Sequence, residues 1–201
     1  MDRDQLSKKY DYTAAILAGG KNTRFSGKIK AKMIINGRPM IEKTIETLQA
    51  VFNDIIIITN IRDEFSSYKN IRIAGDIYHN LGPLGGVHSA LKHSDKEAVF
   101  VVAGDMPELS AETIKYQVKK FEECKCEALI PDYKGYIEPL HAIYDRNILE
   151  RLENFIKTTN DYSIREFLKL LNDKYLVIES IEGDKNPFIN INSPEDLQKW
   201  Y

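Results

Sequence analysis

Ala14-Ala15-Ile16-Leu17-Ala18-Gly19-Gly20 is a short apolar run that leads directly into a pair of glycines. Basic side chains follow this segment at Lys21, Arg24, Lys28, Lys30 and Lys32. An apolar run of this length predicts a strand, and glycines at its end let the backbone approach a phosphate closely. Successive amides and cationic side chains then neutralise the phosphate charge. The segment therefore predicts a strand and loop that hold a nucleoside triphosphate.

The glycine pair does not belong to either of two commoner phosphate-binding motifs. The chain contains neither Gly-x-x-x-x-Gly-Lys-Ser/Thr nor Gly-x-Gly-x-x-Gly, so it has neither a Walker loop nor the dinucleotide fingerprint. A strand followed by two glycines is also the pattern of an ordinary turn between a strand and a helix. The rest of the chain must decide between the two interpretations.

Short β-rich runs recur along the chain and alternate with segments of helical spacing. The runs cover residues 14–18, 55–59, 71–74, 98–103 and 128–131. This alternation predicts an α/β fold with a mostly parallel sheet flanked by helices. A length of 201 residues with 43% hydrophobic content suits one core and is short for two. We therefore expect a single domain over residues 1–201, in which residues 1–11 form a polar N-terminal extension.

Three segments carry helix signals. The first has one apolar face, with Pro39 near its start, formed by Met40, Ile41, Ile45, Leu48 and Phe52. Ser163 and Glu166 form the pattern of a capping box. Ser193-Pro194-Glu195-Asp196 is typical of the start of a short last helix. Residues 132–138 form the most loop-like interior segment.

Charge, hydropathy and cysteine content limit the class of protein. A net charge of −2 gives no basic field for nucleic acid, and the longest aliphatic run, residues 55–58, is too short to span a membrane. We therefore expect a soluble, cytoplasmic protein. Cys124 and Cys126 fall on a predicted helix, where side chains at this spacing point in different directions. We expect two free thiols there, with no disulfide and no metal site.

A second glycine loop, Gly82-Pro83-Leu84-Gly85-Gly86, precedes another predicted helix. It is compatible with a simple turn, but it also offers bare backbone against which a base or ribose could pack. In parallel α/β sheets, loops that follow neighbouring strands meet at the carboxyl edge of the sheet. Two glycine loops after early strands therefore favour one shared cleft at that edge.

Two acidic residues stand just after predicted strands. Asp105 follows the apolar run 98–103, where it could bind Mg²⁺, because this ion needs only one or two protein carboxylates beside phosphate oxygens and water. Alternatively, Asp105 could cap the helix that starts after Pro107 or Ser110. Asp76 follows a shorter strand and could accept a hydrogen bond from a base, a ribose or metal-bound water, or simply serve as a turn residue.

The four histidines do not have the spacing of metal ligands, and no nucleophile motif accompanies them. They are His79, His88, His93 and His141. We expect each to face solvent or to lie at the edge of the core. Nucleophilic catalysis through serine or cysteine has no support in the sequence.

Several motifs, taken in order, resemble the signatures of molybdenum cofactor guanylyltransferases over nearly the whole chain. They are Leu17-Ala18-Gly19-Gly20-Lys21-Asn22-Thr23-Arg24-Phe25, Lys30, Asn36-Gly37-Arg38-Pro39, Gly82-Pro83-Leu84-Gly85-Gly86, Asp105-Met106-Pro107 and Asn190-Ile191-Asn192-Ser193-Pro194-Glu195-Asp196-Leu197. The first is shared by the wider nucleotidyltransferase superfamily, whereas the glycine loop and the last motif are narrower. The resemblance implies a three-layer α/β/α Rossmann-like fold, Mg²⁺, and transfer of GMP from GTP to the terminal phosphate of molybdenum-molybdopterin with release of pyrophosphate.

The resemblance also implies roles for individual residues. Arg24, Lys30 and Asp105 would be catalytic, with the two cations on the phosphates and the carboxylate on Mg²⁺. The guanine nucleotide would be bound by Leu17, Ala18, Gly19, Gly20, Lys30, Asn60, Asp76 and Asp105. Asn190 and Asn192 would lie near the pterin, although an Asn-rich turn before a capped helix also satisfies backbone groups without a ligand.

Spacing identifies the phosphate-binding lysine, and three positions depart from the family pattern. The family's lysine lies seven residues before the glycine at Gly37, which selects Lys30 over Lys32. Ser26 stands where the family usually has a glycine, and Gly104 stands where it commonly has a cysteine. Glu108 stands where the family usually has an apolar residue. They leave every charged group needed for phosphate chemistry in place.

Two other functions remain open from the sequence. One is a sister nucleotidyltransferase that uses CTP on molybdopterin, or another nucleotide on a sugar or alcohol phosphate. The other is a binding module that keeps the nucleotide fold without catalysis, which the joint presence of Arg24, Lys30 and Asp105 disfavours. For the main interpretation we expect a monomer with GTP and molybdenum-molybdopterin as ligands, transient contacts with other proteins of molybdenum cofactor biosynthesis, and no nucleic-acid or membrane partners.

Overall fold

The computed structural model describes residues 9–19, 29–178, 186–197 and 200. Its centre is a sheet with the strand order β10-β7-β9-β6-β1-β4-β5, and β8 pairs with β7. The strands are β1 (Tyr10–Leu17), β4 (Phe52–Ile58), β5 (Arg72–Ala74), β6 (Ala98–Ala103), β7 (Ala128–Tyr133), β8 (Tyr136–Ile137), β9 (His141–Asp145) and β10 (Asp173–Ile178). A separate small ribbon pairs β2 (Ile34–Ile35) with β3 (Arg38–Pro39).

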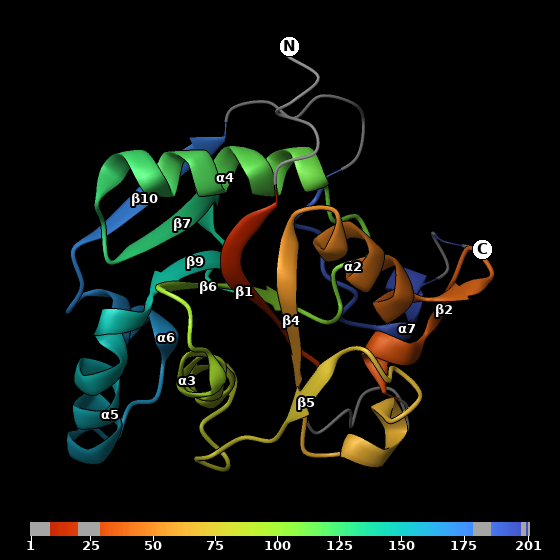
Figure 1. Cartoon of the computed structure of the whole chain (residues 1–201), viewed down its shortest axis with the longest axis horizontal. Coiled ribbons are helices and arrows are strands. Elements are labelled where there is room, and N and C mark those ends of the chain that lie inside the picture. Colours follow the sequence, from red (N-terminus) through yellow and green to blue (C-terminus); the bar gives the residue numbers. More distant parts are fainter. Residues whose placement is uncertain (1–8, 20–28, 179–185, 198–199, 201) are drawn as a thin grey trace.

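Helices lie on both faces of this sheet. They are α2 (Met40–Gln49), α3 (Pro83–His93), α4 (Ala111–Cys124), α5 (Leu149–Thr158), α6 (Ile164–Leu168) and α7 (Pro194–Leu197), with single turns η2 (Lys30–Lys32), η3 (Arg62–Phe65) and η4 (Arg146–Ile148). Apolar residues of α2 and α4 pack on one face, and those of α3, α5 and α6 pack on the other. Figure 1 shows α4 on one side of the sheet and α3 and α5 on the opposite side. The predicted three-layer α/β/α arrangement is confirmed.

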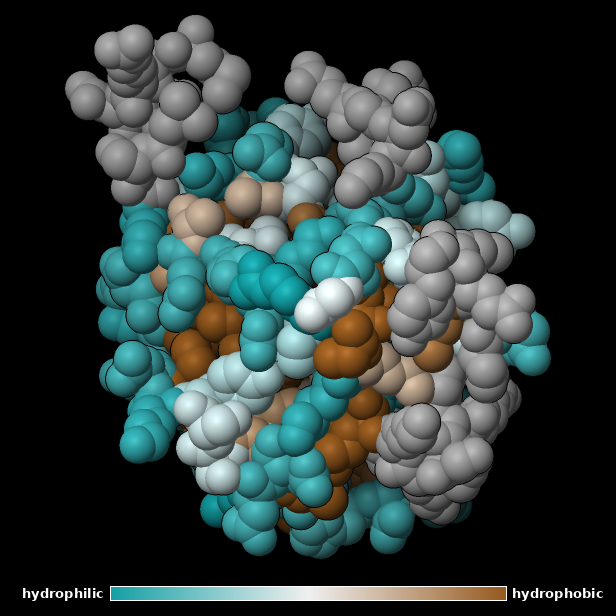
Figure 2. Space-filling model, turned by 90° about the vertical axis from the view of Figure 1, so that its right-hand side faces the viewer, coloured by the Kyte–Doolittle hydropathy of each residue, from teal (hydrophilic) through white to brown (hydrophobic). Residues whose placement is uncertain are grey.

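The central strands are buried on both faces, which explains why they read as continuous apolar runs. In β1, Ala14 and Ile16 pack toward α2 and α4, whereas Ala15 packs toward α3. Side chains alternate between the faces of a strand, so a sheet covered on both sides needs apolar residues at every position. The outer surface is different: Figure 2 shows one face on which hydrophobic residues lie between hydrophilic ones.

Most strand pairs are parallel, as predicted, and one antiparallel strand divides the sheet. The pairs β1–β4, β1–β6, β4–β5 and β7–β10 are parallel. Strand β9 runs antiparallel between β6 and β7. Residues 132–138, expected to be a loop, form a hairpin between β7 and β8, in which Lys134 and Gly135 adopt φ of 55° and 83°. A left-handed residue followed by glycine is the turn chemistry that such hairpins use.

The three predicted helices are present, but one predicted residue and one predicted cap differ. Helix α2 buries the predicted face up to Leu48, but Phe52 is not part of it: Phe52 begins β4 and stacks on Phe100 with ring centroids 5.6 Å apart. Helix α6 begins after Ser163, whose side chain makes no capping hydrogen bond within the described part of the chain. At α7, Asp196 Oδ2 accepts from the Ser193 amide at 3.0 Å, so this helix start is capped as expected.

Cys124 and Cys126 form a disulfide, so the expectation of two free thiols is wrong. Helix α4 ends at Cys124, and Lys125 adopts a left-handed conformation with φ of 51°. This turn folds the chain back, and the two Cα atoms lie 5.3 Å apart, within the range that a disulfide spans. The sequence argument assumed a continuous helix through both cysteines, in which their side chains would diverge.

Two of the four histidines are buried, which corrects the expectation for His88 and His141. The His141 ring packs edge-on against Phe100 and Phe188, with centroids 5.2 and 4.9 Å away. Burial in this apolar site lowers the pKa of His141 from 6.5 to about 4, because it disfavours the charged ring. His141 is therefore a neutral core residue at pH 7.

Among the described residues, no helix has the length and apolar character that crossing a lipid bilayer would require.

Candidate active site

A cavity of about 600 Å³ opens at the carboxyl ends of β1, β4, β5 and β6. Strand β1 has β4 on one side and β6 on the other, so the connections leave it in opposite directions at this edge. Such a switch point is where ligands bind in open α/β sheets. The volume falls within the range typical of small-molecule sites. The expected cleft between the two glycine loops is present, because Gly19, Gly82 and Gly86 all line the cavity.

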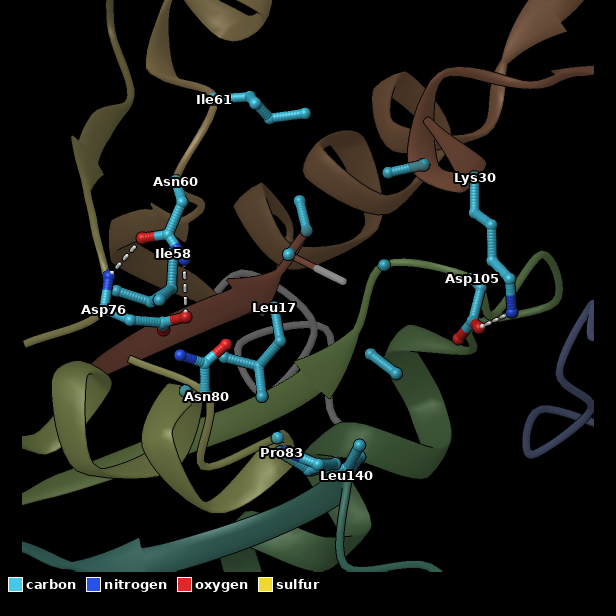
Figure 3. A pocket seen from close by; sticks show the side chains of 17 residues that line it. Leu17, Lys30, Ile58, Asn60, Ile61, Asp76, Asn80, Pro83, Asp105 and Leu140 are labelled. Carbon is cyan, nitrogen blue, oxygen red and sulfur yellow. Dashed lines mark hydrogen bonds and ion pairs between the residues drawn. The ribbon is translucent and has the colours of Figure 1, made fainter. Parts of the chain in front are cut away.

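Two glycines let the end of β1 come close to its neighbours. A Cβ at Gly86 would lie 2.9 Å from Leu17 Cδ1, and one at Gly104 would lie 3.1 Å from the Leu17 carbonyl oxygen. The Gly104 amide donates to that carbonyl at 3.0 Å. Leu17 can therefore lie between α3 and the end of β6, in the middle of the cavity (Figure 3).

One end of the cavity holds a cation and a carboxylate in contact. Lys30 Nζ lies 3.0 Å from Asp105 Oδ2 and 3.5 Å from Asn192 Oδ1. Figure 3 shows the first contact on the side opposite Asn60 and Asp76. The Ile191 amide donates to the Asp105 carbonyl oxygen at 2.9 Å, which fixes the C-terminal segment beside this pair. Lysine and carboxylate are thus held together just after the end of β6.

The other end of the cavity holds a reciprocal side-chain pair. Asn60 Nδ2 donates to Asp76 Oδ2 at 2.8 Å, and the Asp76 amide donates to Asn60 Oδ1 at 2.9 Å. A Cβ at Gly75 would lie 3.2 Å from Asn60 Oδ1, so a glycine leaves room for this pair. Amide and carboxylate groups held in this way present fixed donors and acceptors to a base or a ribose.

The structure brings most of the predicted site residues into one cavity. They are Leu17, Ala18, Gly19, Lys30, Asn60, Asp76 and Asp105. Asn192 reaches the same site through its contact with Lys30, whereas Asn190 lines a second cavity next to it. Gly20, Arg24 and Ser26 lie outside the described residues. Sequence reasoning missed Asn80, which also lines the cavity, and only the turn pattern Asn80-Leu81-Gly82 points to it. Leu140 lines the cavity too; it lies in a segment that resembles the family strand beside the acceptor pocket, and the sequence assigns it no catalytic role.

The choice of Lys30 over Lys32 agrees with the geometry. Lys32 Nζ donates to the carbonyl oxygen of Glu64 at 2.9 Å and to its carboxylate at 2.8 Å, and Lys32 does not line the cavity. Turn η2 therefore presents one lysine to the cavity and the other to the surface.

Asp105 does not cap the next helix, which removes the alternative role considered for it. Ser110 caps α4, because its Oγ accepts from the Thr113 amide at 3.2 Å. Glu108, at a position that is usually apolar in the family, is buried and lies 3.4 Å from Lys43 Nζ. Asp105 remains available to the cavity.

The donor set suits a metal ion that brings phosphate oxygens as further ligands. No group of three or more His, Cys, Asp or Glu that could hold an ion occurs within the described residues. Asp105 supplies a partly exposed carboxylate, with 20% of its side chain accessible. Mg²⁺ binds through one or two carboxylates together with substrate phosphates and water, so this arrangement fits it, whereas a dedicated all-protein site would need more ligands.

A second cavity of about 310 Å³ adjoins the first. Pro83 and Leu140 line both cavities, and Figure 3 shows them together at the edge of the first. Met106, which follows Asp105 in the chain, lines the second cavity, as does Asn190. The two cavities therefore adjoin at Pro83 and Leu140, and the consecutive residues Asp105 and Met106 line one cavity each.

This architecture is that of a nucleotidyltransferase, and the chain belongs to the family described as the MobA-like NTP transferase domain, whose model matches residues 14–175. It is 40% identical over 190 residues to "Probable molybdenum cofactor guanylyltransferase" of Pyrococcus furiosus, covering 92% of this chain and 94% of that protein. It is 30% identical over 191 residues to "Molybdenum cofactor guanylyltransferase" of Syntrophotalea carbinolica, covering 94% and 90%.

A solved structure agrees with this assignment. The crystal structure of molybdopterin-guanine dinucleotide biosynthesis protein A from Archaeoglobus fulgidus superposes with a TM-score of 0.79 at 30% identity, covering 93% of this chain and 95% of that one. The similarity therefore extends over the sheet and both helical layers, and the expected family is confirmed.

Proposed function

We propose that this protein is a molybdenum cofactor guanylyltransferase: a single-domain enzyme that transfers GMP from GTP to the terminal phosphate of molybdenum-molybdopterin and releases pyrophosphate. The main support is the Lys30–Asp105 pair, whose charged atoms lie 3.0 Å apart in a cavity that holds the Asn60–Asp76 pair at its other end. The relatives at 30–40% identity bear the name of this activity. Phosphate chemistry at one end and base or ribose recognition at the other is the arrangement that a nucleotide needs.

The nucleotide would lie across the carboxyl end of β1. Backbone groups of Leu17, Ala18, Gly19 and Gly20 would contact it, and Asn60 with Asp76 would bind its base or ribose. The 600 Å³ cavity is large enough for a nucleotide of this class. Its α-phosphate would then lie near Lys30 and Asp105.

Transfer would proceed by direct attack of an acceptor phosphate oxygen on the α-phosphorus of GTP. One oxygen–phosphorus bond forms, the bond between the α-phosphorus and the bridging oxygen breaks, and pyrophosphate leaves with the electron pair. Because the acceptor oxygen is already anionic, no general base is required. Lys30 and Arg24 would neutralise the charge that develops on the leaving group, so the protein acts by positioning and electrostatic stabilisation.

Asp105 would hold Mg²⁺, which supplies charge neutralisation to the α- and β-phosphates when it is bound. Lys30 Nζ lies 3.0 Å from Asp105 Oδ2, so both groups lie at the end of the cavity where the phosphates would bind. Asn192, within 3.5 Å of Lys30, and Asn190, in the adjoining cavity, would face the acceptor. We further propose that the enzyme acts as a cytoplasmic monomer, with only transient contacts to proteins that deliver or receive the cofactor.

Pyrophosphate release tests the proposal. The purified protein is incubated with GTP, CTP, ATP or UTP and Mg²⁺, with and without molybdenum-molybdopterin. We expect release only with GTP and the pterin together. Pyrophosphate release with another nucleotide would mean that the same mechanism acts on a different substrate. No release with any combination would favour a binding module without catalysis.

A further inference from the structure

The second cavity, called the slot from here on, is lined mostly by apolar side chains. Its apolar walls are formed by residues from four separate segments: Pro83, Met106, Ile137, Pro139, Leu140 and Ile164. Four side chains with polar groups also line it, and they are Tyr136, Glu138, Arg165 and Asn190. A pocket that is mostly apolar with a few convergent polar groups is typical of small-molecule recognition.

Glu138 places a carboxylate in this slot. Its side chain is half-buried, and within the described part of the chain no group donates a hydrogen bond to its carboxylate. Burial raises the pKa of Glu138, and the charge of Arg165 opposes this shift. A partly desolvated carboxylate without hydrogen bonds is costly, so a ligand that supplies donors would be bound favourably.

We propose that Glu138 determines acceptor specificity by accepting two hydrogen bonds from the amino-pyrimidinone edge of the acceptor's pterin ring. This edge carries a ring N–H next to an exocyclic amino group, and a carboxylate offers two acceptor oxygens to such a pair. The apolar walls would cover the faces of the ring. A sugar or alcohol phosphate lacks the flat apolar faces that these walls would cover, so the slot favours a pterin over these acceptors. The inference rests on the proposed function and names how its acceptor is recognised.

The geometry connects this slot to the reaction. Met106 lines the slot and its neighbour Asp105 lines the nucleotide cavity, and Pro83 and Leu140 line both, so the slot opens next to the cavity that holds the Lys30–Asp105 pair. Asn190 lines the slot and is two residues from Asn192, which contacts Lys30. A ring bound at Glu138 can therefore extend a phosphate-bearing side chain toward the α-phosphate.

Binding of two free rings tests the proposal without GTP or turnover. Pterin (2-amino-4-oxopteridine) carries the amino donor, whereas lumazine (2,4-dioxopteridine) has a carbonyl oxygen in its place. Calorimetric titration of the wild-type protein should show pterin binding at least 10-fold more tightly than lumazine. Equal affinities, or no binding of either ring, would overturn the proposal, and this comparison requires no variant.

The variant Glu138→Gln tests whether Glu138 is the residue that distinguishes pterin from lumazine. Glutamine replaces one acceptor by a donor that faces the donors of the ring. We expect pterin affinity to fall about 10- to 100-fold, the range for losing a hydrogen bond to a charged group, with lumazine affinity nearly unchanged. Glu166→Gln is the matched control: Glu166 neighbours Arg165 but forms its ion pair with Lys169, and it does not line the slot.

The results separate this inference from the proposed function. If GTP fails to support pyrophosphate release but the wild-type protein distinguishes the two rings, the proposed reaction fails and the pterin slot stands. If turnover occurs but Glu138→Gln leaves pterin affinity and the KM for the acceptor unchanged, the role of Glu138 is wrong and the reaction stands. With both correct, the variant raises the KM for the acceptor and leaves the KM for GTP unchanged.

Discussion

Replacing Lys30 by alanine should separate catalysis from folding. Lys30 Nζ is held 3.0 Å from Asp105 at the point where we place the phosphates. Removing one preorganised donor from a site of developing negative charge costs about 10²- to 10³-fold in kcat. We expect Lys30→Ala to lose activity by this factor, because alanine leaves the charge on the departing pyrophosphate without its cation.

The same change should have little effect on stability. The Lys30 and Asp105 side chains retain 22% and 20% of their exposure, so their ion pair is screened by water and contributes about 0–1 kcal/mol to the free energy of unfolding. For a chain of this size such a loss lowers the melting temperature by no more than about 2–4 °C. A large loss of kcat with a nearly unchanged melting temperature is therefore the expected result.

Lys32→Ala provides the matched control. Lys32 lies on the same turn, but its ammonium group contacts Glu64 at the surface. Steady-state pyrophosphate release and thermal unfolding are measured for both variants and the wild-type protein. The reasoning would be refuted if Lys30→Ala kept more than about a third of the wild-type kcat, or if Lys32→Ala lost as much activity as Lys30→Ala.

Three further predictions follow from other parts of the structure. Asn60→Ala removes both hydrogen bonds to Asp76 and should raise the KM for GTP about 3- to 10-fold with little change in kcat; an unchanged KM would contradict a nucleotide role. His141 has a pKa of about 4 when folded and 6.5 when unfolded, so its contribution of about 3 kcal/mol is present above pH 6.5 and is lost as pH falls toward 4. Denaturant unfolding of His141→Phe should show a free energy of unfolding that depends less on pH between 6.5 and 4 than that of the wild-type protein. An equal pH dependence in the two proteins would count against a neutral, buried His141. The disulfide predicts no titratable thiol in the unreduced, denatured protein and two after reduction, whereas two thiols before reduction would exclude it.

Patterns that act within one strand or one turn could be predicted from the sequence. The five apolar runs became β1, β4, β5, β6 and β7, because strands buried on both faces need apolar residues throughout. The two glycine loops and Asp105 were correctly expected at one edge of the sheet, because carboxyl ends of parallel strands share that edge. Lys30 could be chosen over Lys32 only through spacing within a known family.

Features that depend on distant pairing could not be predicted in this way. Strand β9 is placed between β6 and β7 by contacts with both, and nothing local in residues 141–145 specifies an antiparallel direction. Phe52 continued the helical period of α2 but begins β4, since packing on Phe100 outweighs the local pattern. The disulfide depends on one left-handed residue, Lys125, a conformation that lysine seldom adopts.

The second cavity was also out of reach of the sequence. Its walls come from the start of α3, the residue after Asp105, the segment around β8, the start of α6 and the C-terminal segment. Glu138 was merely part of an expected loop, because its free carboxylate becomes informative only once the apolar walls around it are known. A single half-buried charge has no signature in a linear pattern.

The most direct test of the central claim follows the label of the nucleotide. GTP labelled with ³²P at the α-position is incubated with the protein, Mg²⁺ and molybdenum-molybdopterin, and a parallel reaction uses GTP labelled at the γ-position. GMP transfer predicts that the α-label appears in the pterin dinucleotide and that the γ-label appears in pyrophosphate. Label from the γ-position in the pterin product, or an α-label that never leaves the free nucleotide pool, would contradict the account.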